Sequence, residues 1–137
     1  MKSRSRHVAQ TTATVLVVLA ATSQAAVYYV SPEGNNTTGQ SWATAFNSLQ
    51  TAIDAAPSAS GDVIRVRYGT YAITSAIAIS KPIGIYGGYS GLADTRNPAA
   101  FPTVIQGGGV APPRFSIRSA ATIDGLFDRA SAAGGQI

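Results

Sequence analysis

Cysteine is absent from this chain of 137 residues, and histidine occurs once, at His7. Without cysteine no disulfide can form, so the core and the backbone hydrogen bonds must hold the fold together. Zinc and copper sites are built largely from Cys and His, and a Ser-His-Asp triad needs an imidazole base. The sequence therefore predicts no metal site, no cofactor and no catalytic residue of these kinds.

Charged residues are also scarce, at 12% of the chain, with 10 basic and 6 acidic residues and a formal charge of +4. Three of the positive charges, Lys2, Arg4 and Arg6, lie in a segment that we expect to be removed. The rest of the chain is nearly neutral and has no cluster of Lys and Arg among aromatic residues. We therefore expect no nucleic-acid partner.

A long hydrophobic run is missing as well. The apolar stretch 13–21, which contains Thr14, is about half of the roughly 20 residues that span a bilayer. Basic residues precede it, and Ser23 and Ala25 then place small side chains at the −3 and −1 positions of a cleavage site. We predict that residues 1–25 are a signal peptide, cleaved before Ala26. The protein would then be secreted or held at the cell surface, with no transmembrane segment left.

One segment, 48–56, has the pattern of a short amphipathic helix. Asn47 is expected to cap it, with Gln50 three residues later, and Pro57 to end it. The positions that share its apolar face are Phe46, Leu49, Ala52, Ile53 and Ala56. A single short helix is unstable alone, so we expect it to cap an apolar interior. Trp42 and Phe46 are expected to pack between this helix and the loop before it.

Alternation of apolar and small or polar residues predicts several short strands. Their apolar positions are Ile64, Val66, Ile77, Ile79, Ile83, Ile85, Phe115 and Ile117. The isoleucines recur at near-constant intervals, 19 residues from Ile64 to Ile83, 20 from Ile85 to Ile105 and 18 from Ile105 to Ile123. Short strands at such intervals favour the coils of a solenoid. A sandwich, with a strand every 8–12 residues or so, is the alternative.

Several segments, taken in order, carry a family resemblance. They are YYVSPEGNNTTGQSWATAFNSLQTAIDAA at 28–56, GDVIRVRYGTY at 61–71, IGIYGGYSGLADTRNPAAFPTVIQGG at 83–108 and ATIDGL at 121–126. Together they resemble the N-terminal portion of secreted bacterial right-handed parallel β-helix proteins, a group that includes pectate-lyase-like and adhesin-like proteins. The resemblance implies an all-β fold, a right-handed parallel β-helix (solenoid) with one short N-terminal capping helix.

The same resemblance implies how the chain is organised. Residues 26–137 would hold the N-terminal cap and the first coils of the β-helix domain. At 127–129 the expected alternation breaks, and the chain ends at 134–137, in the middle of what would be the next coil. We interpret the chain as a truncated, incomplete β-helix fragment. Its last strand edge would be open, which favours self-association.

Arg65 and Arg67 are the candidate polysaccharide-binding residues. At positions i and i+2 of a strand, both side chains point away from the core. A solvated outer face is the plainer interpretation of such a pair. Lyases of the resembling group use a Lys or Arg as base, but the residues around this pair do not match such a catalytic segment. The sequence therefore assigns a catalytic role to neither arginine.

The carboxylates are scattered along the chain. Asp124 and Asp128 are the closest pair in sequence, and we expect them to cap turns and to be solvated. Asp62, which follows a glycine and precedes a strand, is expected to form a turn rather than to bind calcium, since calcium needs six to eight oxygen ligands. Neither a glycosidase pair nor a calcium site is predicted.

Two functions are compatible with these patterns. The first is a secreted or cell-surface scaffold without catalytic activity, whose partner is a polysaccharide or another component of a cell surface. The second is the N-terminal part of a pectate-type polysaccharide lyase whose catalytic coils are missing from this chain. We favour the first, and with it a chain that is not an enzyme, because every recognised segment is scaffold.

Overall fold

The computed structural model describes residues 15–18, 24–58, 61–111 and 113–130. Most of the predicted signal peptide, 1–25, lies outside these residues, so export stays a prediction. The elements are β1 (Val27–Val30), the 3-10 turn η1 (Trp42–Thr44), α1 (Leu49–Ala55), β2 (Val63–Arg67), β3 (Gly69–Ile73), β4 (Ile77–Ile79), β5 (Gly84–Tyr89), β6 (Thr103–Gly107), β7 (Phe115–Ile117), β8 (Thr122–Asp124) and β9 (Leu126–Ala130). None of the helices in the described part is long and apolar enough to cross a membrane.

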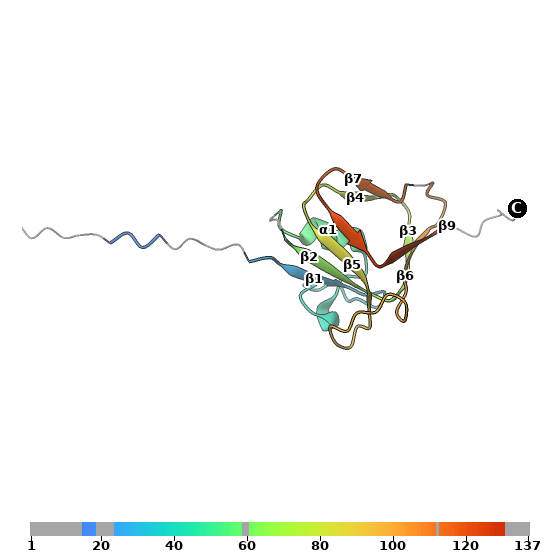
Figure 1. The fold of residues 1–137 in the computed structure, drawn as a ribbon, viewed down its shortest axis with the longest axis horizontal. Coiled ribbons are helices and arrows are strands. Elements are labelled where there is room, and N and C mark those ends of the chain that lie inside the picture. Colours follow the sequence, from blue (N-terminus) through green and yellow to red (C-terminus); the bar gives the residue numbers. More distant parts are fainter. Residues whose placement is uncertain (1–14, 19–23, 59–60, 112, 131–137) are drawn as a thin grey trace, which may run out of the picture.

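The strands form three parallel sheets around a shared interior (Figure 1). Their orders are β1-β2-β5-β8, β3-β6-β9 and β4-β7. Each pair is parallel, and partners lie far apart in the chain, as parallel pairing requires a long connection. Strands β7, β8 and β9 each end their sheet among the described residues. Self-association through these edges stays a prediction.

The predicted fold class, a right-handed parallel β-helix solenoid, is wrong. The described residues form three small parallel sheets of 4, 3 and 2 strands, with 37% strand and one helix, and no solenoid is found among them. The isoleucine intervals do not follow the strand register. Ile64 pairs with Ile85 rather than with Ile83, and Ile105 pairs with Tyr71 in a different sheet. The connections differ in length, so no constant interval relates one strand to its partner.

The interior is formed by the apolar sides of β1 to β6, whereas the predicted apolar position Ile117 on β7 is 50% exposed. The buried cluster contains Val30, Phe46, Leu49, Ala52, Ile53, Ile64, Val66, Tyr71, Ile77, Ile79, Ile83, Ile85 and Ile105. The inward positions predicted on β2 and β5 are therefore confirmed, while Ile123 on β8 is only partly buried. Full burial of an aliphatic side chain of this size stabilises a fold by roughly 1.5–3 kcal/mol, so these isoleucines dominate the core.

Helix α1 lies against β1, β2 and β4 and buries its predicted apolar face. Its N-cap is Ser48, whose Oγ accepts a hydrogen bond from the Thr51 amide, so the predicted cap at Asn47 is wrong. Gln50 does not close a capping box either. Its side chain accepts from the Ala78 amide at 2.8 Å and donates to the Ala78 carbonyl at 3.2 Å. The helix is therefore tied to β4 by a side chain that the local pattern assigned to capping.

Lys81 caps the C-terminal end of α1. Its ammonium donates to the carbonyls of Ile53, Asp54 and Ala56. The last carbonyls of a helix have no partner within the helix, and a positive charge there also interacts well with the helix dipole. This contact joins α1 to the connection between β4 and β5, which are far from it in sequence.

Candidate functional site

The two candidate arginines lie on the outer side of the four-stranded sheet. Across its strands Tyr29 pairs with Arg65, Arg65 with Tyr86, and Tyr86 with Asp124. Paired residues of neighbouring strands are about 4.8 Å apart and point to the same side. The outer side therefore carries a row of alternating aromatic and charged side chains. The residues one position earlier in each strand point to the inner side and are apolar.

A bulge in β5 adds another aromatic ring to this side. The register shifts between Arg65 and Arg67, so that Arg67 pairs with Tyr89 instead of with Gly88. Gly88 has a φ of 88°, and a Cβ there would lie 2.6 Å from the Cα of Pro98. Only glycine fits both conditions without strain. The extra residue places Tyr89 on the same side of the sheet as the arginines, where its side chain is buried.

Arg65 is held between two rings and one carboxylate. Its guanidinium carbon lies 5.7 Å from the ring centre of Tyr29 and 5.6 Å from that of Tyr89. Its Nη1 is 2.6 Å from Asp94 Oδ2. Burial alone would lower the Arg65 pKa, but the hydrogen bond and charge of Asp94, with smaller contributions from the tyrosines, raise it above its usual value. The side chain is therefore a fixed cation.

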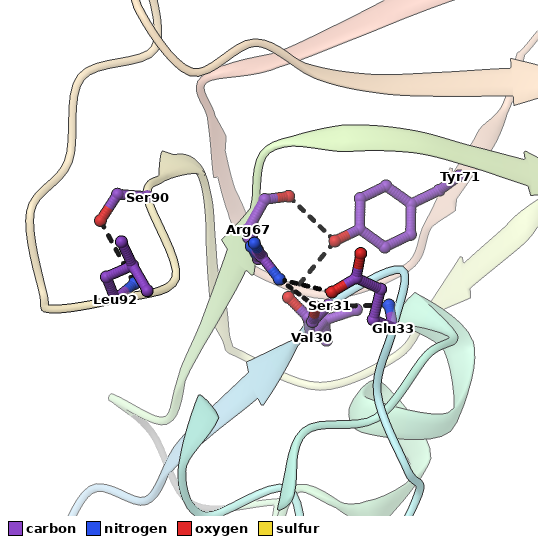
Figure 2. A network of polar contacts seen from close by, with 7 residues as sticks. All are labelled: Val30, Ser31, Glu33, Arg67, Tyr71, Ser90 and Leu92. Carbon is purple, nitrogen blue, oxygen red and sulfur yellow. Dashed lines mark hydrogen bonds and ion pairs between the residues drawn. The ribbon is translucent and has the colours of Figure 1, made fainter. Parts of the chain in front are cut away.

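Arg67, two residues further along β2, likewise contacts an aromatic ring and a carboxylate. Its guanidinium carbon lies 5.2 Å from the ring centre of Tyr68, and its Nη1 donates to Glu33 Oε2 at 3.1 Å and to Ser31 Oγ at 3.5 Å (Figure 2). Burial acts to lower the Arg67 pKa, but the hydrogen-bonding contacts with Tyr68 and Glu33 and the charge of Glu33 raise it above its usual value. The Glu33 side chain is 82% exposed, so one partner of this ion pair faces solvent.

A buried tyrosine fixes the backbone beneath Arg67. The Tyr71 hydroxyl lies 2.9 Å from the Arg67 carbonyl and 3.3 Å from the Val30 carbonyl, and it can donate to either (Figure 2). Burial raises the pKa of the Tyr71 phenol far above its usual value, although the charge of Arg67 opposes this. The phenol therefore stays protonated and links β1, β2 and β3 from the inside.

A third arginine, Arg96, extends the row and was not found from the sequence. Its guanidinium carbon lies 5.5 Å from the ring centre of Tyr86, and it forms an ion pair with Asp124. Its Nε donates to the Gly87 carbonyl at 2.9 Å. No local pattern pointed to it because it lies in the irregular connection after β5. The Gly87-Gly88, Ser90-Gly91 and Asn97-Pro98 pairs are signals that the backbone changes direction there.

Trp42 also belongs to this side of the molecule. Its ring is 4.7 Å from that of Tyr29, edge to face, and 5.8 Å from that of Tyr89. The prediction that Trp42 packs between the loop and the helix is therefore wrong, although Phe46 does enter the core, 6.2 Å from the ring of Tyr28. We call the set of residues Tyr29, Glu33, Trp42, Arg65, Arg67, Tyr68, Tyr86, Tyr89, Asp94, Arg96 and Asp124 the Arg–Tyr face.

The charges of the Arg–Tyr face balance, since each of its arginines has one carboxylate partner. The partner carboxylates are 57%, 82% and 59% exposed, whereas the arginine side chains are 23–27% exposed. Such a surface offers flat apolar rings, guanidinium donors and carboxylate acceptors, but no net charge that would attract a polyanion.

A small hollow lies at one end of the Arg–Tyr face. It has a volume of about 200 Å³ and is lined by Pro32, Glu33, Arg67, Tyr68, Gly69 and Thr70. A larger groove of about 240 Å³ adjoins the hollow at Pro32 and Thr70. It lies between the start of α1 and the connection from β3 to β4, and neither candidate arginine lines it. The hollow is therefore the place where a small group would contact an ion pair and a ring together.

The carboxylates of the described residues do not gather in one place. Asp124 and Asp128, predicted to cap turns and to be solvated, are 59% and 49% exposed and form ion pairs with Arg96 and Arg114. Within residues 15–18, 24–58, 61–111 and 113–130, no three His, Cys, Asp or Glu side chains come together as metal ligands would. The structure thus brings Arg65 and Arg67 together with aromatic rings and not with acidic groups arranged for hydrolysis.

Comparison with protein-family models, curated proteins and solved structures finds no match for this chain. Nothing in these comparisons identifies a pectate-lyase-like or adhesin-like protein, so that resemblance stays a prediction based on sequence segments alone.

Proposed function

We propose that this chain is an exported, non-catalytic protein that binds polysaccharide through its Arg–Tyr face. One observation carries the proposal, the hollow in which the Arg67–Glu33 ion pair and the Tyr68 ring line the same space. Tyr68 is 40% exposed, so part of its ring is accessible to a ligand.

The chemistry of this hollow suits a sugar ring. The C–H side of a pyranose packs on an aromatic face, and its hydroxyls both donate and accept hydrogen bonds. Arg67 supplies donors and Glu33 supplies acceptors within 3.1 Å of each other. Because the arginines of the face are neutralised by their carboxylate partners, an uncharged polysaccharide fits better than a polyuronate.

The row of rings extends this contact beyond a single sugar. Tyr29, Tyr86 and Trp42 are all partly exposed along the same side of the sheet. Successive strands of a sheet are separated by about 4.8 Å, close to the length of one sugar unit in a chain. A polysaccharide laid across the strands would therefore meet a ring or an ion pair at each unit.

The test is affinity gel electrophoresis of the purified protein in gels that contain a soluble neutral glucan, a xyloglucan or polygalacturonate. We expect retardation by a neutral polysaccharide. Tyr68→Ala removes the accessible ring and should weaken binding roughly 3- to 10-fold, the effect of losing one aromatic contact. Arg67→Ala, which also removes the ion pair with Glu33, should weaken it at least as much.

The matched control is Phe127→Ala on β9, which removes an exposed ring from another sheet. It should leave the retardation unchanged. Circular dichroism of each variant checks that it is folded. Absence of retardation by every polysaccharide, or an equal loss in Phe127→Ala and Tyr68→Ala, would show that the Arg–Tyr face is not a sugar-binding surface.

A further inference from the structure

Asp62 is a buried carboxylate that the Arg–Tyr face does not use. It is fully buried, directly before β2. Its Oδ1 accepts a hydrogen bond from the backbone nitrogen of Ala26 at 2.8 Å, while its Oδ2 is buried and has no partner among the described residues. An unsatisfied buried carboxylate oxygen is costly, so it points to a missing donor.

Both backbone polar groups of Ala26 are hydrogen-bonded. Besides the contact of its nitrogen with Asp62, its carbonyl accepts from the Val63 amide at 2.8 Å. The Asp62 carbonyl in turn accepts from the Gly84 amide at 2.9 Å. The nitrogen of Ala26 is therefore fixed beside the carboxylate by the β1–β2 and β2–β5 pairs.

The residues immediately before Ala26 are exposed. Gln24 and Ala25 lie at the surface, and the core cluster contains no residue that precedes Tyr28. The sequence places the expected signal-peptide cleavage at this same Ala25–Ala26 bond. A protease can thus reach the bond without dismantling the interior.

Cleavage changes the donor that faces Asp62. Hydrolysis of the Ala25–Ala26 bond consumes one water, leaves a carboxylate on Ala25 of the released peptide and leaves an amine on Ala26, which takes up a proton. The backbone amide offers one hydrogen, whereas the resulting ammonium offers three and carries a positive charge. It can therefore pair with Oδ1 and Oδ2 together, in a charge-assisted contact.

We propose that Asp62 is the buried binding site for the N-terminal ammonium that processing creates at Ala26. Removal of residues 1–25 then fastens β1 to β2 and stabilises the mature fold. This inference rests on the export that is part of the proposed function, and it is independent of sugar binding. It gives Asp62 a charge partner that the described residues do not supply.

The experiment compares three preparations by thermal unfolding, the full chain, residues 26–137 with a free amine, and residues 26–137 with an acetylated amine. The shorter chain keeps every member of the core cluster. We expect the free amine to melt higher than the acetylated form by roughly 4 °C or more, the shift that about 1 kcal/mol produces in a domain of this size. The full chain should resemble the acetylated form.

The Asp62→Asn variant should remove the difference between the free and acetylated forms, because the amide has no charge for the ammonium. Asp54→Asn, on the exposed side of α1, should leave that difference intact. Equal melting temperatures of the free and acetylated wild-type forms would overturn the inference, and that comparison does not depend on whether Asp62→Asn folds. A difference that persists in Asp62→Asn would also overturn it.

Sugar binding and processing are measured separately. N-terminal sequencing of the exported protein should give Ala26 first, and another first residue would remove the basis of the inference. Gel retardation of the free-amine form by neutral polysaccharide tests only the Arg–Tyr face. A stable mature N-terminus without sugar binding would contradict the proposed ligand and leave the role of Asp62 standing.

Discussion

Gly88→Ala should be unusually destabilising for the addition of one methyl group. Gly88 has a φ of 88°, where an L-residue costs about 1–2 kcal/mol. The added Cβ would also lie 2.6 Å from the Cα of Pro98, a backbone atom that cannot rotate away. Overpacking of this kind adds about 1–3 kcal/mol. The expected loss is therefore roughly 2–5 kcal/mol of unfolding free energy.

Gly109→Ala is the matched control. Gly109 has a φ of 95°, but a Cβ there would meet nothing within 4 Å. Both variants share the backbone strain and the reduced freedom of the unfolded chain. The difference between them therefore isolates the contact with Pro98, and Gly88→Ala should lose about 1–3 kcal/mol more than Gly109→Ala.

The assay is urea unfolding followed by the fluorescence of Trp42, the one tryptophan of the chain. Trp42 contacts Tyr29 and Tyr89, so its emission reports directly on the region that the bulge shapes. If Gly88→Ala proves no less stable than Gly109→Ala, then β5 does not carry the tight bulge described here. The position of Tyr89 on the same side of the sheet as the arginines would then need another explanation.

Two further predictions concern the interior. Tyr71→Phe should lose about 1 kcal/mol at neutral pH, through the bond to the Arg67 carbonyl. Because burial raises the folded-state pKa of Tyr71 above its usual 10.0, its contribution is present below that pH and is lost as the pH rises above it. Urea midpoints between pH 8 and 11.5 should therefore fall less steeply for Tyr71→Phe than for the wild type, and equal slopes would contradict this. Ile83→Asp places a charge at a side chain that is 2% exposed and should abolish the folded circular dichroism spectrum, whereas Ala78→Asp on the exposed side of β4 should not. A folded Ile83→Asp protein would mean that Ile83 is not inside.

The alternation of side chains along each strand was readable from the sequence because it is a local property. Ile64, Val66 and Ile85 face inward where the period of two predicts it, and the apolar face of α1 is buried as expected. The absence of cysteine was likewise readable without any knowledge of the fold, while the removal of His7 with the leader stays a prediction. These conclusions depend on residue type and spacing alone.

Pairing between strands was not readable in the same way. The isoleucine intervals suggested equal coils, but Ile105 lies in the three-stranded sheet and Ile85 in the four-stranded one. Which strand pairs with which depends on how connections of different length close around one interior. That is a property of the whole chain, so a regular spacing of one residue type misled the prediction of fold class.

The partners of the functional side chains were decided by tertiary structure as well. Sequence reasoning selected Arg65 and Arg67 because they alternate with buried residues, yet it could not supply Asp94 or Glu33 as their partners. Both acids lie in irregular connections, whose path has no period. The sequence by itself determined which side chains point outward. Only the folded chain determined that the outward arginines meet Asp94 and Glu33, and that Asp62 meets the nitrogen of Ala26, because these contacts join residues about 30 or more positions apart.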